Sequence, residues 1–312
     1  MTALSPVPRP PDHLAGQAGF SGKPAIGAMR FMFRGLSAVA PDIAAELALR
    51  VFLTPQRHRV PDWERTYRDT ARTGEIQVAR RKVATYRWGR SSRRVLLCHS
   101  WGGRATQLGA FVDGLLERGM QAVGFDAPAH GQSDGKRTDM MEYSAAVAAM
   151  VGAYGPFDAI IGHSFGAGNA LFAQRRHGFD VQRIALIGCF AHGRDITERF
   201  GRLLDIPANV IERMRHRLER RYDGALRWDT LDIAAMAAGS TADILLLHDR
   251  DDREIPHADA ERIVARCGET VTLLSTDGLG HRRILRNPGV VRRVCSFVDV
   301  GLDAATRASR TL

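Results

Sequence analysis

Cysteine, lysine and long apolar runs are all scarce in this sequence of 312 residues. The four cysteines lie far apart and form no C-x-x-C pair, so neither a disulfide framework nor a thiolate metal site is indicated, and we expect buried thiols. No segment reaches about 18 uncharged apolar residues, which excludes a membrane-spanning helix. The N-terminus lacks an apolar run behind a basic start, so we expect no secretory signal and a cytoplasmic protein. The cysteines are Cys98, Cys189, Cys267 and Cys295.

Lysine contributes only three of the 44 basic residues, which stand against 34 acidic ones and give a net charge of +10. The excess of positive charge is unevenly distributed along the chain. Residues 1–94 hold 17 basic and 7 acidic residues, whereas residues 95–312 hold 27 of each. A nucleic-acid surface would need its positive charge close to the functional residues. We therefore expect no nucleic-acid partner.

The bulk composition is that of an ordinary soluble protein, with 45% hydrophobic and 25% charged residues. The 31 glycines and 13 prolines are too few for a collagen-like or wholly disordered chain. The length allows two small domains or one large α/β domain with insertions. Composition does not predict the oligomeric state.

The N-terminal part has two patterns. Residues 1–24 are rich in proline and glycine and predict a tail or an extended arm. Residues 25–53 have helical spacing of apolar residues, and Pro41 divides them into two helical stretches. These stretches are either a basic amphipathic membrane anchor or helices packed on the main domain. We favour packing, because the apolar face is rich in alanine, and we expect no membrane association.

Strand patterns follow from residue 75. Alternation around residues 76–78 and 83–88 predicts an antiparallel hairpin. Six short, continuously apolar runs then alternate with helical segments, as in parallel strands buried on both faces and joined by crossover helices. The runs are VLLCH 95–99, QAVGFD 121–126, DAIIGHS 158–164, RIALIG 183–188, DILLLHD 243–249 and TVTLLS 270–275.

One gap in this alternation is longer than the rest. About 55 residues separate Gly188 from Asp243 and include the helical pattern NVIERMRHRLERRY. Such an insertion would lie over the carboxyl ends of the strands, where open α/β sheets bind ligands. We expect residues 190–238 to form a cap. The predicted organisation is an N-terminal tail and helical extension over 1–74, a main domain over 75–302 and a C-terminal tail over 303–312.

The pentapeptide G-H-S-F-G at 162–166 joins a predicted strand to a predicted helix. A strand, a sharp turn and a helix expose the hydroxyl of a serine at the turn, which makes Ser164 the candidate nucleophile. Gly162 and Gly166 are expected because neighbouring backbone leaves no room for a Cβ. His163 and Phe165 complete the turn.

A serine hydroxyl needs a base and a group that orients the base. His281 follows one predicted strand, and Asp252 follows the preceding one, so both would lie on the same rim as Ser164. Three histidines compete for the role of base, and His281 is favoured because Gly278 and Gly280 suit an exposed loop. The competing residues are Asp249 and Asp251 for the acid, and His248 and His257 for the base.

The sequence H-S-W-G-G at 99–103 follows another predicted strand. Acyl transfer requires two backbone N–H groups directed at the developing oxyanion. Phe165, after the serine, would supply one, and Trp101 the other. His99 is expected to hold the loop by hydrogen bonds rather than to take part in the chemistry.

In these sequences the chain resembles the α/β-hydrolase family over residues 75–302. The match rests on H-S-W-G-G, on D-A-P-A-H-G-Q-S at 126–133, on G-H-S-F-G and on the Asp252/His281 pair. Two positions depart from the family pattern: Ala129 stands where glycine is usual, and Ser100 where the usual sequence is His-Gly. In the family, the loop that contains His130 is structural, and the carboxylate precedes an Ile-Pro pair as Asp252 does.

The resemblance implies an α/β-hydrolase fold: a mostly parallel, eight-stranded sheet flanked by helices, with a helical cap and an N-terminal helical extension. It also implies a serine hydrolase that needs no cofactor or metal and acts on a small-molecule acyl substrate. We expect cleavage of a carboxylic ester. The alternatives are a thioesterase or acyltransferase acting on an acyl thioester, and a ligand-binding receptor on a hydrolase scaffold.

Overall fold

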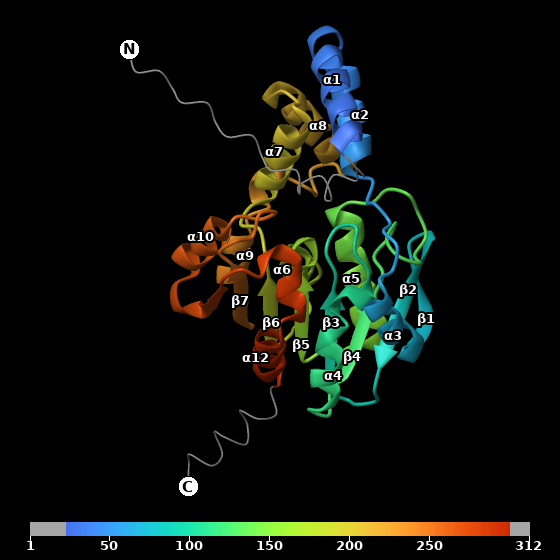
Figure 1. The fold of residues 1–312 in the computed structure, drawn as a ribbon, viewed down its shortest axis with the longest axis vertical. Helices are drawn as coiled ribbons and strands as arrows, with labels where there is room; N and C mark the ends of the chain where they lie inside the picture. The colour runs from blue at the N-terminus through green and yellow to red at the C-terminus, as the bar shows by residue number, and fades with distance from the viewer. Residues whose placement is uncertain (1–22, 300–312) are drawn as a thin grey trace.

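The computed structural model describes residues 23–299 as one central sheet with helices on both faces and a group of helices above one edge (Figure 1). The expected tails over 1–24 and 303–312 lie outside the described residues, except for Lys23 and Pro24. These two residues begin the first helix, α1 (Lys23–Val39), so the helix starts slightly earlier than its apolar spacing indicates.

The sheet has eight strands in the order β1-β2-β4-β3-β5-β6-β7-β8. The hairpin β1–β2 is antiparallel, β2 pairs antiparallel with β4, and all other neighbours are parallel. The predicted hairpin, the six apolar runs and the mostly parallel sheet are confirmed. The strands are β1 (Arg72–Val78), β2 (Arg81–Trp88), β3 (Arg94–Cys98), β4 (Gln121–Phe125), β5 (Ala159–His163), β6 (Arg183–Ile187), β7 (Asp243–Asp249) and β8 (Val271–Thr276).

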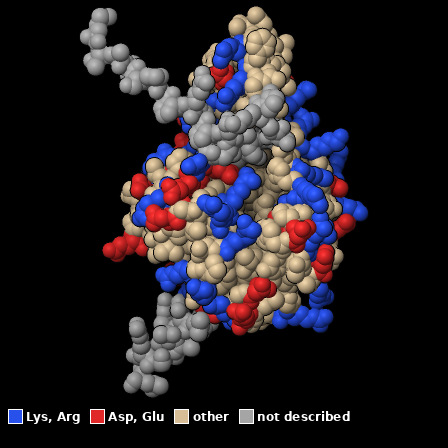
Figure 2. Space-filling model, in the orientation of Figure 1, with Lys and Arg blue, Asp and Glu red and all other residues tan. Residues whose placement is uncertain are grey.

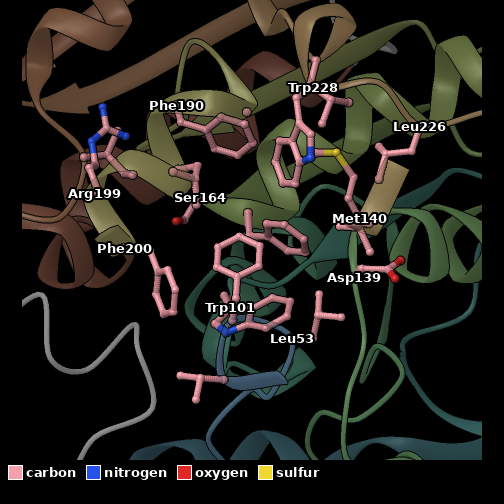
Figure 3. Close-up of a pocket in the computed structure, with 18 of the residues that line it drawn as sticks. Leu53, Trp101, Asp139, Met140, Ser164, Phe190, Arg199, Phe200, Leu226 and Trp228 are labelled. Carbon is pink, nitrogen blue, oxygen red and sulfur yellow. The ribbon is translucent and has the colours of Figure 1, made fainter. Parts of the chain in front are cut away.

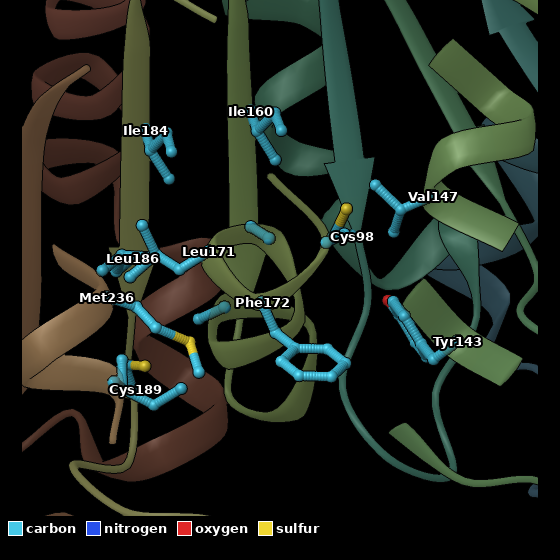
Figure 4. Packing of buried hydrophobic residues seen from close by; sticks show 14 of the residues in the cluster. Cys98, Tyr143, Val147, Ile160, Leu171, Phe172, Ile184, Leu186, Cys189 and Met236 are labelled. Carbon is cyan, nitrogen blue, oxygen red and sulfur yellow. The ribbon is translucent and has the colours of Figure 1, made fainter. Parts of the chain in front are cut away.

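Every residue of β4, β5 and β6 is buried, because helices cover both faces of the sheet. Successive side chains of a strand point to opposite faces, so each strand contributes to two cores. Ile160 and Leu186 belong to one core (Figure 4), whereas Ile161 and Ile187 belong to the other. The continuous apolar runs therefore reflect double-sided burial.

The first core is covered by α5 (Met140–Tyr154), α6 (Phe165–His177), α9 (Ile233–Ala238) and α10 (His257–Cys267). The second is covered by α4 (Ala110–Leu116) and α12 (Pro288–Val298). The helix α3 (Asp62–Thr70) packs beside the loop after β3, where Thr106 Oγ1 donates a hydrogen bond to Glu64 Oε2 at 2.7 Å. All four cysteines are free and buried.

Four helices form a separate layer above the carboxyl ends of the strands, which we call the cap bundle (Figure 1). They are α1, α2 (Pro41–Phe52), α7 (Gly193–Leu204) and α8 (Ala208–Arg221). Pro41 is the first residue of α2, where its missing N–H leaves no hydrogen bond unmade, so the helical pattern breaks there. The bundle thus joins the N-terminal extension to part of the insertion between β6 and β7.

The bundle has its own small core. Phe33 of α1 and Ala44, Ala45 and Ala48 of α2 are completely buried against α7 and α8. Alanines let helix backbones approach closely. The last helix of the insertion, α9, instead packs against α6 and α10 beside the sheet. The insertion therefore serves both the bundle and the main domain.

The surface mixes basic and acidic side chains over most of the face seen in Figure 2. The outer side of the bundle differs, since Phe31, Val39 and Ile43 are 82%, 83% and 62% exposed. In the part of the chain that the structure describes, no helix has the length and apolar character needed to cross a bilayer.

Candidate active site

Ser164 lies at the turn between β5 and α6. Its backbone has φ +54° and ψ −115°, a conformation that costs free energy in a residue other than glycine. Neighbouring backbone holds it there. The Ser164 amide donates to the Ile187 carbonyl at 2.8 Å, and the Ser164 carbonyl accepts from the Ala167 amide at 3.0 Å. The strained turn directs the serine side chain out of the sheet and into a cavity.

The two glycines of this turn have no room for a side chain. A Cβ at Gly166 would lie 2.2 Å from the Cys98 carbonyl oxygen and 2.4 Å from that of His99. A Cβ at Gly162 would lie 2.6 Å from the Cα of Ala167. Both contacts are with backbone atoms, which cannot move aside. The turn therefore requires glycine at both positions.

Asp252 and His281 meet at the same edge of the sheet, after β7 and β8. His281 Nδ1 and Asp252 Oδ2 are 2.6 Å apart, and both side chains are buried. Asp252 Oδ1 accepts from the amides of Glu254 and Ile255 at 2.8 and 2.9 Å. Burial favours protonation, but hydrogen bonds from His248, His281 and the backbone outweigh it and hold the pKa of Asp252 well below its usual value. The carboxylate is thus ionised and fixed.

The two competing aspartates hold the loop that carries His281. Asp249 accepts hydrogen bonds from the amides of Leu279 and Gly280 at 3.0 and 2.8 Å. Asp251 accepts one from the Gly278 amide at 2.9 Å. Neither Asp249 nor Asp251 bonds to the imidazole in the described structure, so of the three aspartates it is Asp252 that holds the ring.

Ser164 and His281 lie against the same end of β6. Ser164 bonds to the Ile187 carbonyl, and a Cβ on the adjacent Gly188 would lie 3.1 Å from His281 Nδ1 and Cε1. The hydrogen bonds of residues 23–299 include none between Ser164 Oγ and His281 Nε2, and this nitrogen is buried without a partner. Catalytic hydrogen bonds are often long before a ligand binds. His281 Nε2 is therefore left without a hydrogen-bond partner among the described residues.

Two further side chains face the His281 imidazole. His163 Nε2 bonds to the His281 carbonyl at 2.9 Å, and its ring lies 4.7 Å from the His281 ring, centroid to centroid. Glu254 Oε2 is 4.0 Å from His281 Nε2 and pairs with Arg282. Burial lowers the pKa of His281 and Arg282 opposes its charge, but the Asp252 hydrogen bond and the Glu254 charge raise it above the usual value.

The loop after β3 brings Trp101 beside Phe165. Their rings are 5.0 Å apart, centroid to centroid, and nearly perpendicular. Neither the Trp101 amide nor the Phe165 amide has a hydrogen-bond acceptor among the described residues. The turn is closed by the Gly103 amide, which donates to the Ser100 carbonyl at 2.9 Å, and Gly102 has φ +68°. Two adjacent backbone donors therefore remain unused near the serine.

His99 holds this loop. Its Nδ1 lies 2.7 Å from the Ser100 carbonyl, and its Nε2 accepts the Ala127 amide at 2.9 Å. Burial lowers the pKa of His99 to about 4, so the ring is neutral near pH 7. Each ring nitrogen already has a backbone partner, as expected for a structural histidine.

The loop D-A-P-A-H-G-Q-S lies beneath the site. The buried Asp126 accepts hydrogen bonds from the Ala105 and Gln132 amides, both at 2.8 Å, and so ties this loop to the one after β3. Ala129 has φ +66°, which explains why glycine is usual at this position in the resembling family. His130 packs its ring 5.3 Å from that of Trp101, centroid to centroid, and no hydrogen bond joins it to Ser164 in the described structure.

An apolar cavity opens beside Ser164, between the sheet and the cap bundle (Figure 3). Trp101, Ser164 and Phe165 line it from the sheet, and α7 and α8 line it from above. The end of α2 contributes Val51, Phe52 and Leu53, and no pattern in the sequence predicts that these residues line a cavity. His281 lies instead against a surface hollow bordered by Glu254 and Arg282. The bundle lining is Val51, Phe52, Leu53, Gly193, Ile196, Arg199, Phe200, Leu203 and Leu218.

Residues beyond the predicted set also face the site. Glu254 lies two positions after Asp252, in a segment with several carboxylates, and the sequence does not indicate that it faces His281. Arg199 is one of many arginines and carried no distinguishing signal. In residues 23–299, no group of three or more histidine, cysteine or acidic residues is placed to hold a metal ion.

Comparison with known proteins agrees with the observed fold. Residues 89–236 match the family of serine aminopeptidases S33. The chain is similar in structure to a putative lipase from Acinetobacter baumannii AYE, with 17% identity, coverage of 80% of this chain and 99% of the other, and a TM-score of 0.58. No curated protein matches the sequence significantly.

Two further solved structures are similar. An esterase from Exiguobacterium antarcticum has 19% identity, coverage of 72% and 98%, and a TM-score of 0.56. A membrane phospholipase A described as a bacterial virulence factor has 19% identity, coverage of 88% and 96%, and a TM-score of 0.57. The sheet order and these structural neighbours show that the chain has the α/β-hydrolase fold.

Proposed function

We propose that this α/β hydrolase cleaves a carboxylic ester through an acyl-enzyme intermediate on Ser164. The observation that carries the proposal is a strained serine facing an apolar cavity, with a buried His281–Asp252 pair bonded at 2.6 Å on the same rim. The similar structures named as a lipase, an esterase and a phospholipase point to the same bond type.

The first chemical step joins the serine oxygen to the acyl carbon. His281 Nε2 removes the hydroxyl proton as Ser164 Oγ attacks, and Asp252 holds the imidazole through Nδ1 and stabilises its charged form. The amides of Trp101 and Phe165 donate to the oxyanion. The intermediate collapses, His281 gives its proton to the leaving alcohol, and the acyl group remains on Ser164.

Water completes the reaction. His281 removes a proton from a water molecule, whose oxygen attacks the acyl carbon, and the proton returns to Ser164 Oγ as the free acid leaves. The apolar cavity beside Ser164 holds the acyl chain. Each proton that His281 accepts is donated again, so one turnover consumes one ester and one water.

The test is the intact mass of the protein after incubation with a fluorophosphonate probe. We expect the wild type to gain one probe mass and S164A to gain none. The control is S240A, which alters a serine whose hydroxyl bonds to Gln174 Oε1, and it should label like the wild type. A folded wild type that stays unlabelled, or labelling that persists in S164A, would refute the assignment and favour the receptor interpretation.

The scissile bond needs a separate measurement. Oxygen and sulfur esters with the same acyl chain are compared by kcat/KM. A clear preference for the oxygen ester supports esterase activity. A clear preference for the sulfur ester identifies a thioesterase with the same residues.

A further inference from the structure

The cavity beside Ser164 is almost entirely apolar, and among the described residues that line it only Asp139 and Arg199 carry a charge. In Figure 3 Arg199 lies on the side of Ser164 and Asp139 on the opposite side. A charged side chain at an apolar cavity needs polar partners, because burial without them costs free energy. The two residues differ in how far this need is met.

Asp139 has a partner for each oxygen. Its Oδ1 accepts from the Glu142 amide at 3.0 Å, at the start of α5, and its Oδ2 accepts from Tyr222 Oη at 2.6 Å. Arg221 lies 3.7 Å from Oδ2. Asp139 therefore has a structural role and offers little to a ligand.

Arg199 is mostly unpaired. Its side chain is 11% exposed, and Nη2 donates to Asp259 Oδ2 at 2.7 Å. A guanidinium has five N–H groups. No other acceptor for Arg199 exists among the described residues, and its Nη1 is buried with no partner. The two Nη1 donors are therefore unused, on a side chain that lines the cavity.

The position of this guanidinium is fixed. Asp259 is buried and also accepts from Arg262 at 2.7 Å, and Arg262 pairs in turn with Asp195. The carboxylate thus holds Arg199 from α10 while α7 carries it. A donor group held in one orientation beside a cavity is preorganised for an acceptor.

We propose that Arg199 binds a carboxylate on the acyl part of the substrate, so that the preferred ester is a monoester of a dicarboxylic acid. Planar guanidinium donors match carboxylate oxygens. A single cation lines the cavity among the described residues, which favours one negative charge over a phosphate dianion. The inference rests on the proposed esterase function, because it assumes that the acyl chain lies in this cavity.

The test compares two pairs of 4-nitrophenyl esters. Each pair has equal acyl length and differs in a terminal carboxylate: adipate monoester with hexanoate, and suberate monoester with octanoate. We expect the wild type to cleave at least one monoester with a kcat/KM about tenfold or more above that of its neutral counterpart. R199M should lose this preference while still cleaving the neutral esters, and R199K should retain part of it.

The matched control is R202M, which removes an exposed arginine from the same helix and should keep the wild-type preference. An R199M preference equal to that of the wild type overturns the proposal and leaves Arg199 as an anchor between α7 and α10. If R199M does not fold, the wild type still tests the proposal. Cleavage of both neutral esters as fast as, or faster than, their dicarboxylic monoester counterparts also overturns the proposal.

A second readout separates this inference from the proposed function. Free adipate should slow fluorophosphonate labelling of the wild type but not of R199M. A wild type that labels at Ser164 without protection and without carboxylate preference refutes only the carboxylate site. A wild type that does not label at all refutes the esterase assignment itself.

Discussion

The central sheet and the cap bundle are held together in different ways. Strands β4, β5 and β6 are buried along their whole length, and their side chains enter two large cores. The bundle has one small core built around Phe33 and the alanines of α2, and many of its ion pairs are solvent-exposed. Its outer side leaves Phe31 and Val39 uncovered.

The sheet and the cap bundle contribute different parts of the candidate site. Ser164, Asp252 and His281 all follow strands, and sheet-edge backbone fixes the turns that carry them. About half of the apolar lining of the cavity comes from the bundle. We therefore expect changes in the sheet to affect the reactivity of the nucleophile, and changes in the bundle to affect the choice of substrate.

The largest contrast is expected between two glycines. G166A places a Cβ 2.2 Å from a backbone oxygen of the sheet region, so we expect little or no folded protein. G35A, within α1, meets nothing within 4 Å and should stabilise the chain by roughly 0.5–1 kcal/mol. Soluble yield and urea unfolding measure both. A well-folded G166A would show that the serine turn can relax.

The next contrast concerns ion pairs. Arg104 and Glu64 are buried beside the loop after β3, with Nε 2.7 Å from Oε2, so E64Q leaves a buried cation and should cost about 3–5 kcal/mol. Arg34 and Asp205 of the bundle are 74% and 51% exposed, and D205N should cost less than about 1 kcal/mol. Urea unfolding at low and high salt compares them. Equal losses of unfolding free energy in E64Q and D205N would show that ion pairs do not distinguish the two regions.

Two phenylalanines of the bundle test its effect on selectivity. Phe52 lines the cavity and its ring lies 5.2 Å from that of Phe200, so F52A should cost about 2 kcal/mol and shift the preference towards bulkier acyl groups. F31A removes an 82% exposed ring and should change neither property. A panel of esters and fluorophosphonate labelling are the measurements. Loss of labelling in a folded F52A would contradict the expectation that the bundle affects the choice of substrate and not the reactivity of Ser164.

The smallest expected effect is a shift in pH dependence. The proposed mechanism uses neutral His281, whose pKa is raised by Asp252 and Glu254, so activity should rise with pH through a value above that of an ordinary histidine. E254Q removes one cause of the raised pKa of His281 and should move the rise in activity to lower pH. The labelling rate against pH measures it, with the exposed E261Q as the control. An unchanged pH for the rise in labelling rate would show that Glu254 does not act on the imidazole.

Much of the sheet could be predicted from the sequence because double-sided burial leaves continuous apolar runs at regular intervals. Ser164, Asp252 and His281 could be named as candidates for the same reason, since each follows such a run. The structure brings these three to one edge, and their catalytic roles remain predictions.

The cavity walls could not be predicted in this way. The spacing of residues 25–53 indicates helices with an apolar face, but it does not say which surface that face meets. Nor does a lone Arg199 among 44 basic residues reveal that it lines a cavity. Such features depend on contacts between segments far apart in the chain, which local patterns do not record.

The end of α2 at Val51–Leu53 also has a consequence for the order in which the protein is made. Its partners in the bundle, residues 193–221, are synthesised roughly ten to thirty seconds later at the usual rate of translation. During that time Phe33 and the alanines of α2 lack their contacts with α7 and α8. The first helices to leave the ribosome are thus among the last to reach their final contacts, and the substrate cavity is complete only when most of the chain exists.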